Sequence, residues 1–370
     1  MSMAGRLLRT GTRLVLPRTA VGSYAGPYRA LGALRNHHCP PDQGSAADTP
    51  LNADVQPSKT GTQPSYGPIG VTAALKHHAE DPAPTSTLFT HEFSLADRVA
   101  LVSGANRGLG LEMALALAEA GARAVYCVDL AKDPSPTFEA ARAYAARLAN
   151  KGGEGRMEYV SGDVTDQEAM WKIGEFIGDA EGRLDTCIAA AGILKNHIDC
   201  LEYPSEEFEQ VMKVNTNGVL YTAQAAGRQM ARFGRGGSII LIASMSGTIT
   251  NKDHAWVSYN ASKSAVLQMA RSMACELGPR RIRVNSLSPG HIYTKCVSSL
   301  SRAEFSGVVV MTAAYLDTHP ELLDKWAGLN PLGRIGRPDE LRGAVTWLAS
   351  DASTFCTGSD IIVSGGHHSW

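Results

Sequence analysis

Short apolar runs alternate with longer helical stretches from about residue 98 to the end of the chain. Seven of these runs are rich in β-branched residues and almost continuously apolar, which is typical of strands that are buried on both faces. They span residues 98–104, 124–130, 156–164, 184–192, 237–244, 281–290 and 359–366. Between them, apolar positions follow a helical period, as in residues 110–121 and 262–278. The alternation predicts βαβ units, a parallel sheet and an α/β fold.

The first part of the chain has a different composition. Residues 1–39 contain six arginines, and the first acidic residue is Asp42. Apolar residues alternate with these arginines so that a helix would have one apolar and one basic face. An Arg-rich, acid-free, amphipathic start is typical of a mitochondrial presequence, so we expect a location in the mitochondrial matrix. The alternative is a disordered basic tail on a cytoplasmic protein.

Residues 40–90 are rich in Pro, Gly, Ser, Thr and Asp and show no sustained apolar period, which predicts a flexible linker. We therefore expect a disordered N-terminal extension followed by a single folded domain over residues 91–370. The net charge of about −1 gives no general attraction to nucleic acid or to an anionic membrane. No apolar run approaches the length of a membrane span, and no metal-ligand spacing is visible.

Three glycines follow the first predicted strand and open the first predicted helix: Gly104, Gly108 and Gly110. In this context Gly104 permits a tight turn, Gly108 lets backbone approach a pyrophosphate, and Gly110 lets the helix pack on the sheet. The start of the helix supplies free N–H groups and a positive dipole for phosphates. The stretch therefore predicts a dinucleotide site.

Two residues bear on which dinucleotide binds. Asp129 ends the second predicted strand, where a carboxylate can accept hydrogen bonds from a ribose diol and repel a 2′-phosphate. Arg107 lies in the glycine loop, where a guanidinium could reach such a phosphate. We predict NAD as the cofactor, with NADP as the alternative. Asp163, at the end of the third predicted strand, is expected to contact the adenine, to cap the following helix, or both.

The stretch "WVSYNASKSAV" places Tyr259 and Lys263 four residues apart, on the same side of a helix. That spacing alone is also common on solvated helix surfaces. The glycine pattern Gly-x-x-x-Gly-x-Gly, followed in order by "GDV", "IAAAG", "KVNTNG", "IASMSG", "YNASK" and "SPG", resembles the short-chain dehydrogenase/reductase family over about residues 95–366. Within that family the motifs are most similar to fungal polyol and sugar reductases of the mannitol, arabinitol and sorbose type.

The resemblance implies a Rossmann-like, doubly wound, seven-stranded parallel sheet and a homo-oligomer, either a tetramer or a dimer. It implies that Tyr259 is the catalytic acid/base, Lys263 its partner, and Asn215 the holder of a water relay that passes by Lys263. Ser244 is the implied substrate-orienting serine, and Ser246 competes for that role. The implied cofactor contacts are Gly104, Arg107, Gly108, Leu109, Gly110, Asp129, Asp163, Val164, Gly192, Asn215, Tyr259, Lys263, Pro289, Ile292 and Thr294.

One motif departs from the family pattern, because the usual Asn-Asn-Ala-Gly turn is "AAAG" at residues 189–192. Small residues still let backbone approach the cofactor, but the side-chain contact of the first asparagine is lost. We expect this change to affect stability or cofactor geometry more than the chemistry.

Hydride transfer from an alcohol carbon also requires the hydroxyl proton to leave. A free tyrosine titrates near pH 10, so we expect the ammonium of Lys263 and the oxidised nicotinamide ring to lower the pKa of Tyr259. A hydrogen bond from Ser244 would stabilise charge that develops on the substrate oxygen. The prediction is an NAD(P)-dependent oxidoreductase that interconverts a small-molecule secondary alcohol and a ketone, on a polyol or sugar.

Residues 295–330 leave two alternatives open. They mix apolar residues with few charges, which would also suit a carbonyl reductase that acts on a hydrophobic or aromatic ketone, or packing at a subunit interface. The C-terminal "HHSW" is expected near a neighbouring subunit's site. A non-catalytic binding scaffold is less favoured, because the Asn215, Ser244, Tyr259 and Lys263 set is complete.

Overall fold

A computed structural model of the chain describes residues 64–148, 155–195, 197–294, 316 and 320–370. The predicted presequence, residues 1–39, lies outside the described residues. So do the first part of the predicted linker, residues 40–63, and most of the segment that follows Thr294. The described residues belong to one compact unit.

One parallel sheet runs through this unit, with the strand order β3-β2-β1-β4-β5-β6-β7. This confirms the predicted α/β, Rossmann-like, doubly wound seven-stranded sheet. The strands are β1 Val99–Ser103, β2 Ala124–Asp129, β3 Arg156–Ser161, β4 Thr186–Ala189, β5 Gly237–Ile242, β6 Ile282–Pro289 and β7 Asp360–Val363.

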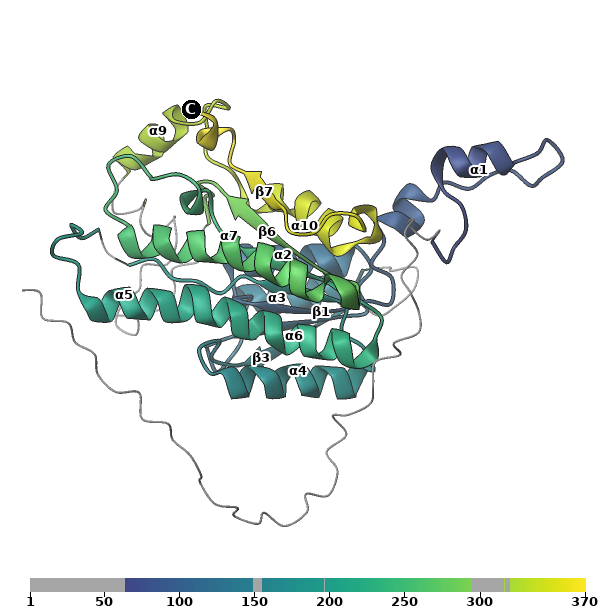
Figure 1. The fold of residues 1–370 in the computed structure, drawn as a ribbon, viewed down its shortest axis with the longest axis horizontal. Coiled ribbons are helices and arrows are strands. Elements are labelled where there is room, and N and C mark those ends of the chain that lie inside the picture. Colours follow the sequence, from purple (N-terminus) through teal and green to yellow (C-terminus); the bar gives the residue numbers. More distant parts are fainter. Residues whose placement is uncertain (1–63, 149–154, 196, 295–315, 317–319) are drawn as a thin grey trace, which may run out of the picture. The chain divides into compact units, whose positions relative to one another are not determined.

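Helices cover both faces of the sheet (Figure 1). Helices α4, α6 and α7 pack on one face, and α2, α3 and α10 pack on the other. The α-helices are α1 Gly70–Lys76, α2 Gly108–Glu119, α3 Pro136–Ala145, α4 Gln167–Glu181, α5 Ser205–Met212, α6 Val219–Phe233, α7 Val257–Leu277, α9 Glu321–Gly328 and α10 Arg342–Ala349. No described helix is long and apolar enough to cross a membrane.

The alternation of β1 side chains explains why its sequence is apolar throughout. Val99 and Leu101 point to the face covered by α4, α6 and α7, whereas Ala100 and Val102 point to the opposite face. All four are fully buried. Burying one large aliphatic side chain contributes about 1.5–3 kcal/mol to the stability of the fold. A strand with both faces covered therefore stabilises the fold through the side chains on each face.

The strands end earlier than the apolar runs predicted. β1, β3, β4 and β5 stop at Ser103, Ser161, Ala189 and Ile242, and the chain then enters loops at the carboxyl edge of the sheet. β1 lies between β2 and β4, so the crossovers diverge there. Such a switch point opens a crevice at the carboxyl ends of the strands. The residues of each apolar run that follow the end of its strand therefore lie at this crevice and are candidates for a binding site.

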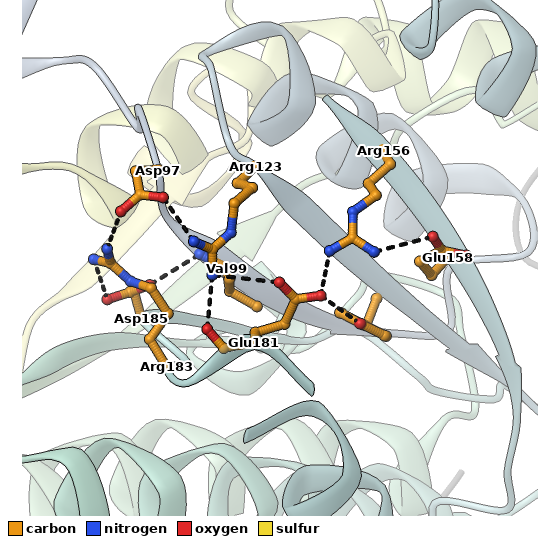
Figure 2. Close-up of polar contacts among 9 residues, drawn as sticks. Asp97, Val99, Arg123, Arg156, Glu158, Glu181, Arg183 and Asp185 are labelled. Carbon is orange, nitrogen blue, oxygen red and sulfur yellow. Dashed lines mark hydrogen bonds and ion pairs between the residues drawn. The ribbon is translucent and has the colours of Figure 1, made fainter. Parts of the chain in front are cut away.

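A network of ion pairs occupies the opposite, amino edge of the sheet (Figure 2). Glu181 at the end of α4 has a side chain only 5% exposed. Its carboxylate pairs with Arg123 and Arg156 and accepts a hydrogen bond from the Tyr126 hydroxyl. These residues lie at or beside the starts of β2 and β3, so the network ties α4 to two strand ends.

Within the predicted linker, residues 40–90, the described part contains one regular helix, α1 Gly70–Lys76, which buries no residue. It is followed by a π-helical turn at Leu88–Glu92, and Tyr66 stacks on His91 with ring centroids 4.9 Å apart. The flexibility of this linker stays a prediction.

Candidate active site

The glycine loop after β1 is built from close approaches. Gly104 has φ of +67°, and a Cβ there would lie 2.7 Å from the Cα of Ala191. A Cβ on Gly110 would overlap the carbonyl oxygen of Gly104. Gly108 has φ of +60°, but nothing lies within 4 Å of where its Cβ would be. Two glycines therefore pack the loop and the start of α2, while the third presents bare backbone to open space, as a phosphate requires.

The altered turn at residues 189–192 is the backbone against which Gly104 packs. Ala191 N lies 3.4 Å from the hydroxyl of Ser103, which is its acceptor. A Cβ on Gly192 would be 3.4 Å from Oδ1 of Asn215 and 3.6 Å from Nζ of Lys263. The turn thus joins the glycine loop to the residues predicted to be catalytic.

Asp129 ends β2 beside the glycine loop. One carboxylate oxygen accepts a hydrogen bond from Asn106 N at 3.0 Å, and the other accepts one from Leu130 N at 2.8 Å. The side chain is thereby fixed at the loop and remains half-exposed. Arg107, in the loop itself, is exposed.

Asp163 lies exposed at the same edge, and its Oδ1 accepts a hydrogen bond from Thr165 N at 2.8 Å. The cap of α4 is Asp166, whose Oδ1 accepts from Ala169 N at 3.0 Å. The expectation that Asp163 could cap this helix is therefore wrong, since it closes the turn before it. Between them, Val164 packs against Gly218, whose absent Cβ would lie 2.7 Å from it.

Asn215 lies in a π-helical turn, Lys213–Gly218, between α5 and α6. It is fully buried and exchanges two hydrogen bonds with the backbone of Ile193, at 2.8 and 2.9 Å. Its Nδ2 also donates to Ser262 on α7 at 3.1 Å. A π-turn often marks a functional position, because it shifts one side chain out of helical register. Here it directs Asn215 to the chain beyond β4 and to α7.

Tyr259, Lys263 and Ser244 meet at the start of α7. The Tyr259 hydroxyl hydrogen-bonds with the side chain of Ser244. Nζ of Lys263 lies 5.6 Å from the Tyr259 ring centroid and donates to the carbonyl of Ile242 at 2.8 Å. Ser246, the competing serine, donates its backbone N–H to Ser244 Oγ. The contact with Tyr259 favours Ser244 for the substrate-orienting role.

Burial dominates the titration of this pair. It raises the pKa of Tyr259 above its usual value, although the hydrogen bond with Ser244 opposes the rise. Burial also lowers the pKa of Lys263, to about 8. The expectation that Lys263 would lower the pKa of Tyr259 is therefore outweighed by desolvation in the protein alone. The protein holds a protonated phenol at neutral pH, which is the acid form that ketone reduction needs.

The turn after β6 lies at the same carboxyl edge of the sheet and carries the last of the predicted cofactor contacts. β6 ends at Pro289, and a Cβ on the next residue, Gly290, would lie 2.7 Å from Cα of Ser364. Ile292 is buried and pairs with Gly336 in an isolated bridge. Thr294 is the last described residue of this turn. The structure thus brings the predicted cofactor contacts of β1, β2, β4 and β6 to one edge of the sheet.

Sequence reasoning missed a row of aromatic rings beside Tyr259, which we call the aromatic ladder. The Trp256 ring lies 6.4 Å from the Tyr259 ring, and His254 stacks on Trp256 with centroids 4.1 Å apart. Trp326 contacts His254 at 5.7 Å and stacks on His291 at 4.1 Å. The ladder consists of His254, Trp256, His291, Trp326 and His367, the last being 5.2 Å from His291. Two short stretches rich in aromatic residues and histidine could have indicated the ladder: "DHAW" before Tyr259 and "GHIY" after β6.

Burial lowers the pKa of each imidazole of the ladder, to about 4 for His254 and to about 3 for His291. The charge of Lys325 lowers the pKa of His254 further. Trp256 and Trp326 form an apolar cluster with Leu316, against which Leu194, Tyr259 and Tyr293 pack. The wall next to the predicted acid/base is therefore largely apolar and uncharged.

A parallel doubly wound sheet, a glycine loop at its switch point and a Ser-Tyr-Lys group at the same edge define a nicotinamide-dependent oxidoreductase. A family profile described as enoyl-(acyl carrier protein) reductase matches residues 104–368. The chain belongs to the short-chain dehydrogenase/reductase family, acts on alcohol or carbonyl groups, and uses NAD or NADP.

Individual relatives are close over most of the folded region. Sorbose reductase of Schizosaccharomyces pombe is 38% identical, with 75% of this chain and 98% of the relative covered. D-arabinitol 2-dehydrogenase (ribulose-forming) of Candida tropicalis is 34% identical, with coverage of 75% and 95%. The crystal structure of a gluconate 5-dehydrogenase from Burkholderia cenocepacia, in complex with NADP and tartrate, is 30% identical with a TM-score of 0.61, covering 75% and 98%. These similarities confirm the resemblance to polyol and sugar reductases.

Proposed function

We propose that this protein interconverts a polyol and the corresponding ketose, with Tyr259 as the acid/base. The observation that carries the proposal is the meeting of Tyr259, Ser244 and the buried Lys263 at the start of α7, where Nζ of Lys263 lies 5.6 Å from the Tyr259 ring centroid. Sorbose reductase and D-arabinitol 2-dehydrogenase among the relatives support the choice of substrate class.

Each residue has a defined task in this proposal. When bound, the nicotinamide supplies or accepts the hydride. Tyr259 donates the phenolic proton to the carbonyl oxygen in reduction, and its phenolate accepts the hydroxyl proton in oxidation. Ser244 orients the same oxygen and stabilises charge on it. Lys263 and Asn215 hold the buried edge in place through the carbonyl of Ile242 and the backbone of Ile193.

NAD is the proposed preferred cofactor. Asp129 is fixed at the glycine loop by two backbone N–H groups, at the place where a ribose diol would lie. A fixed carboxylate there disfavours a 2′-phosphate. Arg107 is exposed on the same loop and keeps NADP as the alternative.

A second candidate function is reduction of a hydrophobic or aromatic ketone. The apolar cluster of Trp256, Leu316 and Trp326 against Tyr259 favours it. The test is a steady-state panel of polyols, ketoses and apolar ketones, each with NAD(H) and NADP(H). Highest kcat/KM on a polyol or ketose supports the first proposal, and highest kcat/KM on an apolar ketone overturns it in favour of the second.

Two further proposals concern the whole chain. Residues 1–39 are proposed to direct the protein to mitochondria, and a fluorescent fusion of residues 1–45 that stays in the cytosol would overturn this. A homo-oligomer, tetramer or dimer, is proposed from the resemblance to the family. Sedimentation velocity of the folded protein that gives only the monomer mass would contradict it.

A further inference from the structure

Two neighbouring residues of α9 hold the loop that precedes α7. Nζ of Lys325 lies 2.9 Å from Oδ2 of Asp253, and Nε1 of Trp326 donates a hydrogen bond to Nε2 of His254 at 3.0 Å. Asp253 has φ of +61°, an uncommon backbone conformation for a residue other than glycine. These contacts fix the orientation of the His254 ring from a distant part of the chain.

The hydrogen bond from Trp326 also determines which nitrogen of His254 carries the proton. The indole N–H can only donate, so Nε2 must be the acceptor. The neutral ring then carries its hydrogen on Nδ1. No described residue accepts a hydrogen bond from that Nδ1–H. Because burial lowers the pKa of His254 to about 4, the ring is uncharged at neutral pH.

The position of His254 relative to the reacting group is informative. It lies between Ser244 and Tyr259 in the sequence, and in space the ring of Trp256 lies beside both, 4.1 Å from the His254 ring and 6.4 Å from the Tyr259 ring. His254 is half-exposed, unlike Trp256 and Trp326, which are 6% and 2% exposed. A substrate whose carbonyl oxygen meets Tyr259 and that reaches past the edge of Trp256 would meet the exposed part of His254.

We propose that His254 is a specificity-determining residue, whose Nδ1–H donates a hydrogen bond to a hydroxyl of the substrate remote from the reacting carbon. This rests on the proposed function in that the substrate is a polyol or ketose. An uncharged donor can pair with a neutral hydroxyl without burying a charge, whereas a guanidinium would bind a carboxylate or phosphate more strongly.

The test compares a ketohexose with its mono-deoxy analogues, each of which lacks one hydroxyl. The wild type should favour the parent over one analogue by about three- to tenfold in kcat/KM, the range for one neutral hydrogen bond. His254→Phe keeps a ring on Trp256 but has no donor, so it should remove that preference by raising KM for the parent alone. The KM for the cofactor should not change.

His254→Asn serves as the matched control, because its amide can accept from Trp326 and still donate. It should restore a substantial part of the preference. Trp326→Phe leaves His254 in place without its fixed tautomer and should weaken the preference, which keeps the proposal testable if His254→Phe does not fold. An equal loss on the parent and all analogues, or an unchanged preference, overturns the proposal.

Failure of the proposed function would look different. In that case the wild type turns over no polyol or ketose but reduces apolar ketones. The same comparison is then made between an apolar ketone with a remote hydroxyl and the ketone without it. A loss in His254→Phe confined to the hydroxylated ketone supports the role of His254 alone, and an equal loss on both overturns it.

Discussion

At the scale of single residues, the balance between burial and hydrogen bonding sets the proton on Tyr259. Burial raises the pKa of the phenol, and the contact with Ser244 lowers it by less. Burial has the opposite effect on the pKa of Lys263. Desolvation disfavours its charged ammonium form and lowers its pKa to about 8. The same low-dielectric surroundings that favour the protonated phenol would strengthen the hydrogen bond that we propose it donates to the substrate oxygen.

Replacing Tyr259 by Phe removes the hydroxyl and keeps the ring. We expect kcat to fall by about 10²–10⁴, the usual contribution of a positioned acid/base. The dissociation constant for the cofactor, measured by fluorescence titration, should stay within about twofold, since no binding group of the glycine loop is touched. Substantial turnover by Tyr259→Phe would contradict the assigned role.

Replacing Asp129 by Ala removes the carboxylate that we propose faces the ribose. The ratio of kcat/KM with NADP to that with NAD should rise by about tenfold or more, which corresponds to about 1.4 kcal/mol. Asp163→Ala is the control, because Asp163 is predicted to contact the adenine, which both cofactors share, so its loss should weaken both equally. An unchanged ratio in Asp129→Ala would show that the ribose argument is wrong.

At the scale of elements, the start of α2 depends on how closely its backbone approaches the loop after β1. A Cβ on Gly110 would overlap the carbonyl oxygen of Gly104, and backbone cannot move aside as a flexible side chain can. The π-helical turn of Asn215 is a similar device, since it lets one side chain leave the helix and reach Ile193.

Gly110→Ala should therefore displace α2 and destabilise the fold by about 1–3 kcal/mol, the usual cost of overpacking. Cofactor affinity should fall with it. Gly343→Ala on α10 is the matched control, because nothing lies within 4 Å of its Cβ position. In a helix that change should stabilise by about 0.4–1 kcal/mol. Urea denaturation measures both, and equal stabilities for the two variants would refute the packing argument.

At the scale of the whole sheet, chemistry and structural charges occupy opposite edges. The site lies at the carboxyl ends of the strands, and the ion pairs around Glu181 lie at the amino ends (Figure 2). Hydrogen bonds from Tyr126 and Arg156 and the charge of Arg123 hold the pKa of Glu181 below its usual value, against its desolvation. The contribution of Glu181 to stability is therefore complete above about pH 4.5, the usual value, and is lost as the pH falls through the lower folded-state value.

Glu181→Gln should destabilise the protein at pH 7 by about 1–3 kcal/mol, because it leaves partners of a largely buried carboxylate unpaired. The difference from the wild type should shrink as the pH falls below 4.5. Glu158→Gln is the control, since the side chain is 40% exposed and lies 3.4 Å from Arg156, so its effect should stay within about 1 kcal/mol. Denaturant midpoints across pH 3–7 measure this, and a pH-independent deficit in Glu181→Gln would refute the linkage.

The sequence by itself determined what depends on local pattern. Continuous apolar runs predicted the parallel sheet because both faces of each strand are covered. The glycine spacing predicted the loop before α2, and the four-residue spacing brought Tyr259 and Lys263 to one side of α7. Such features follow from short-range geometry, which a single sequence displays.

Only the tertiary structure decided what depends on distant residues meeting. The contact of Gly104 with Ala191, the hydrogen bond from Trp326 to His254 and the stacking of His291 on Trp326 join segments far apart in the sequence. No period or spacing encodes these pairs, because chain crossovers and the packing of α9 determine them. The meeting of Tyr259 and Lys263 on α7 could thus be predicted from the sequence, whereas the aromatic ladder beside them could not.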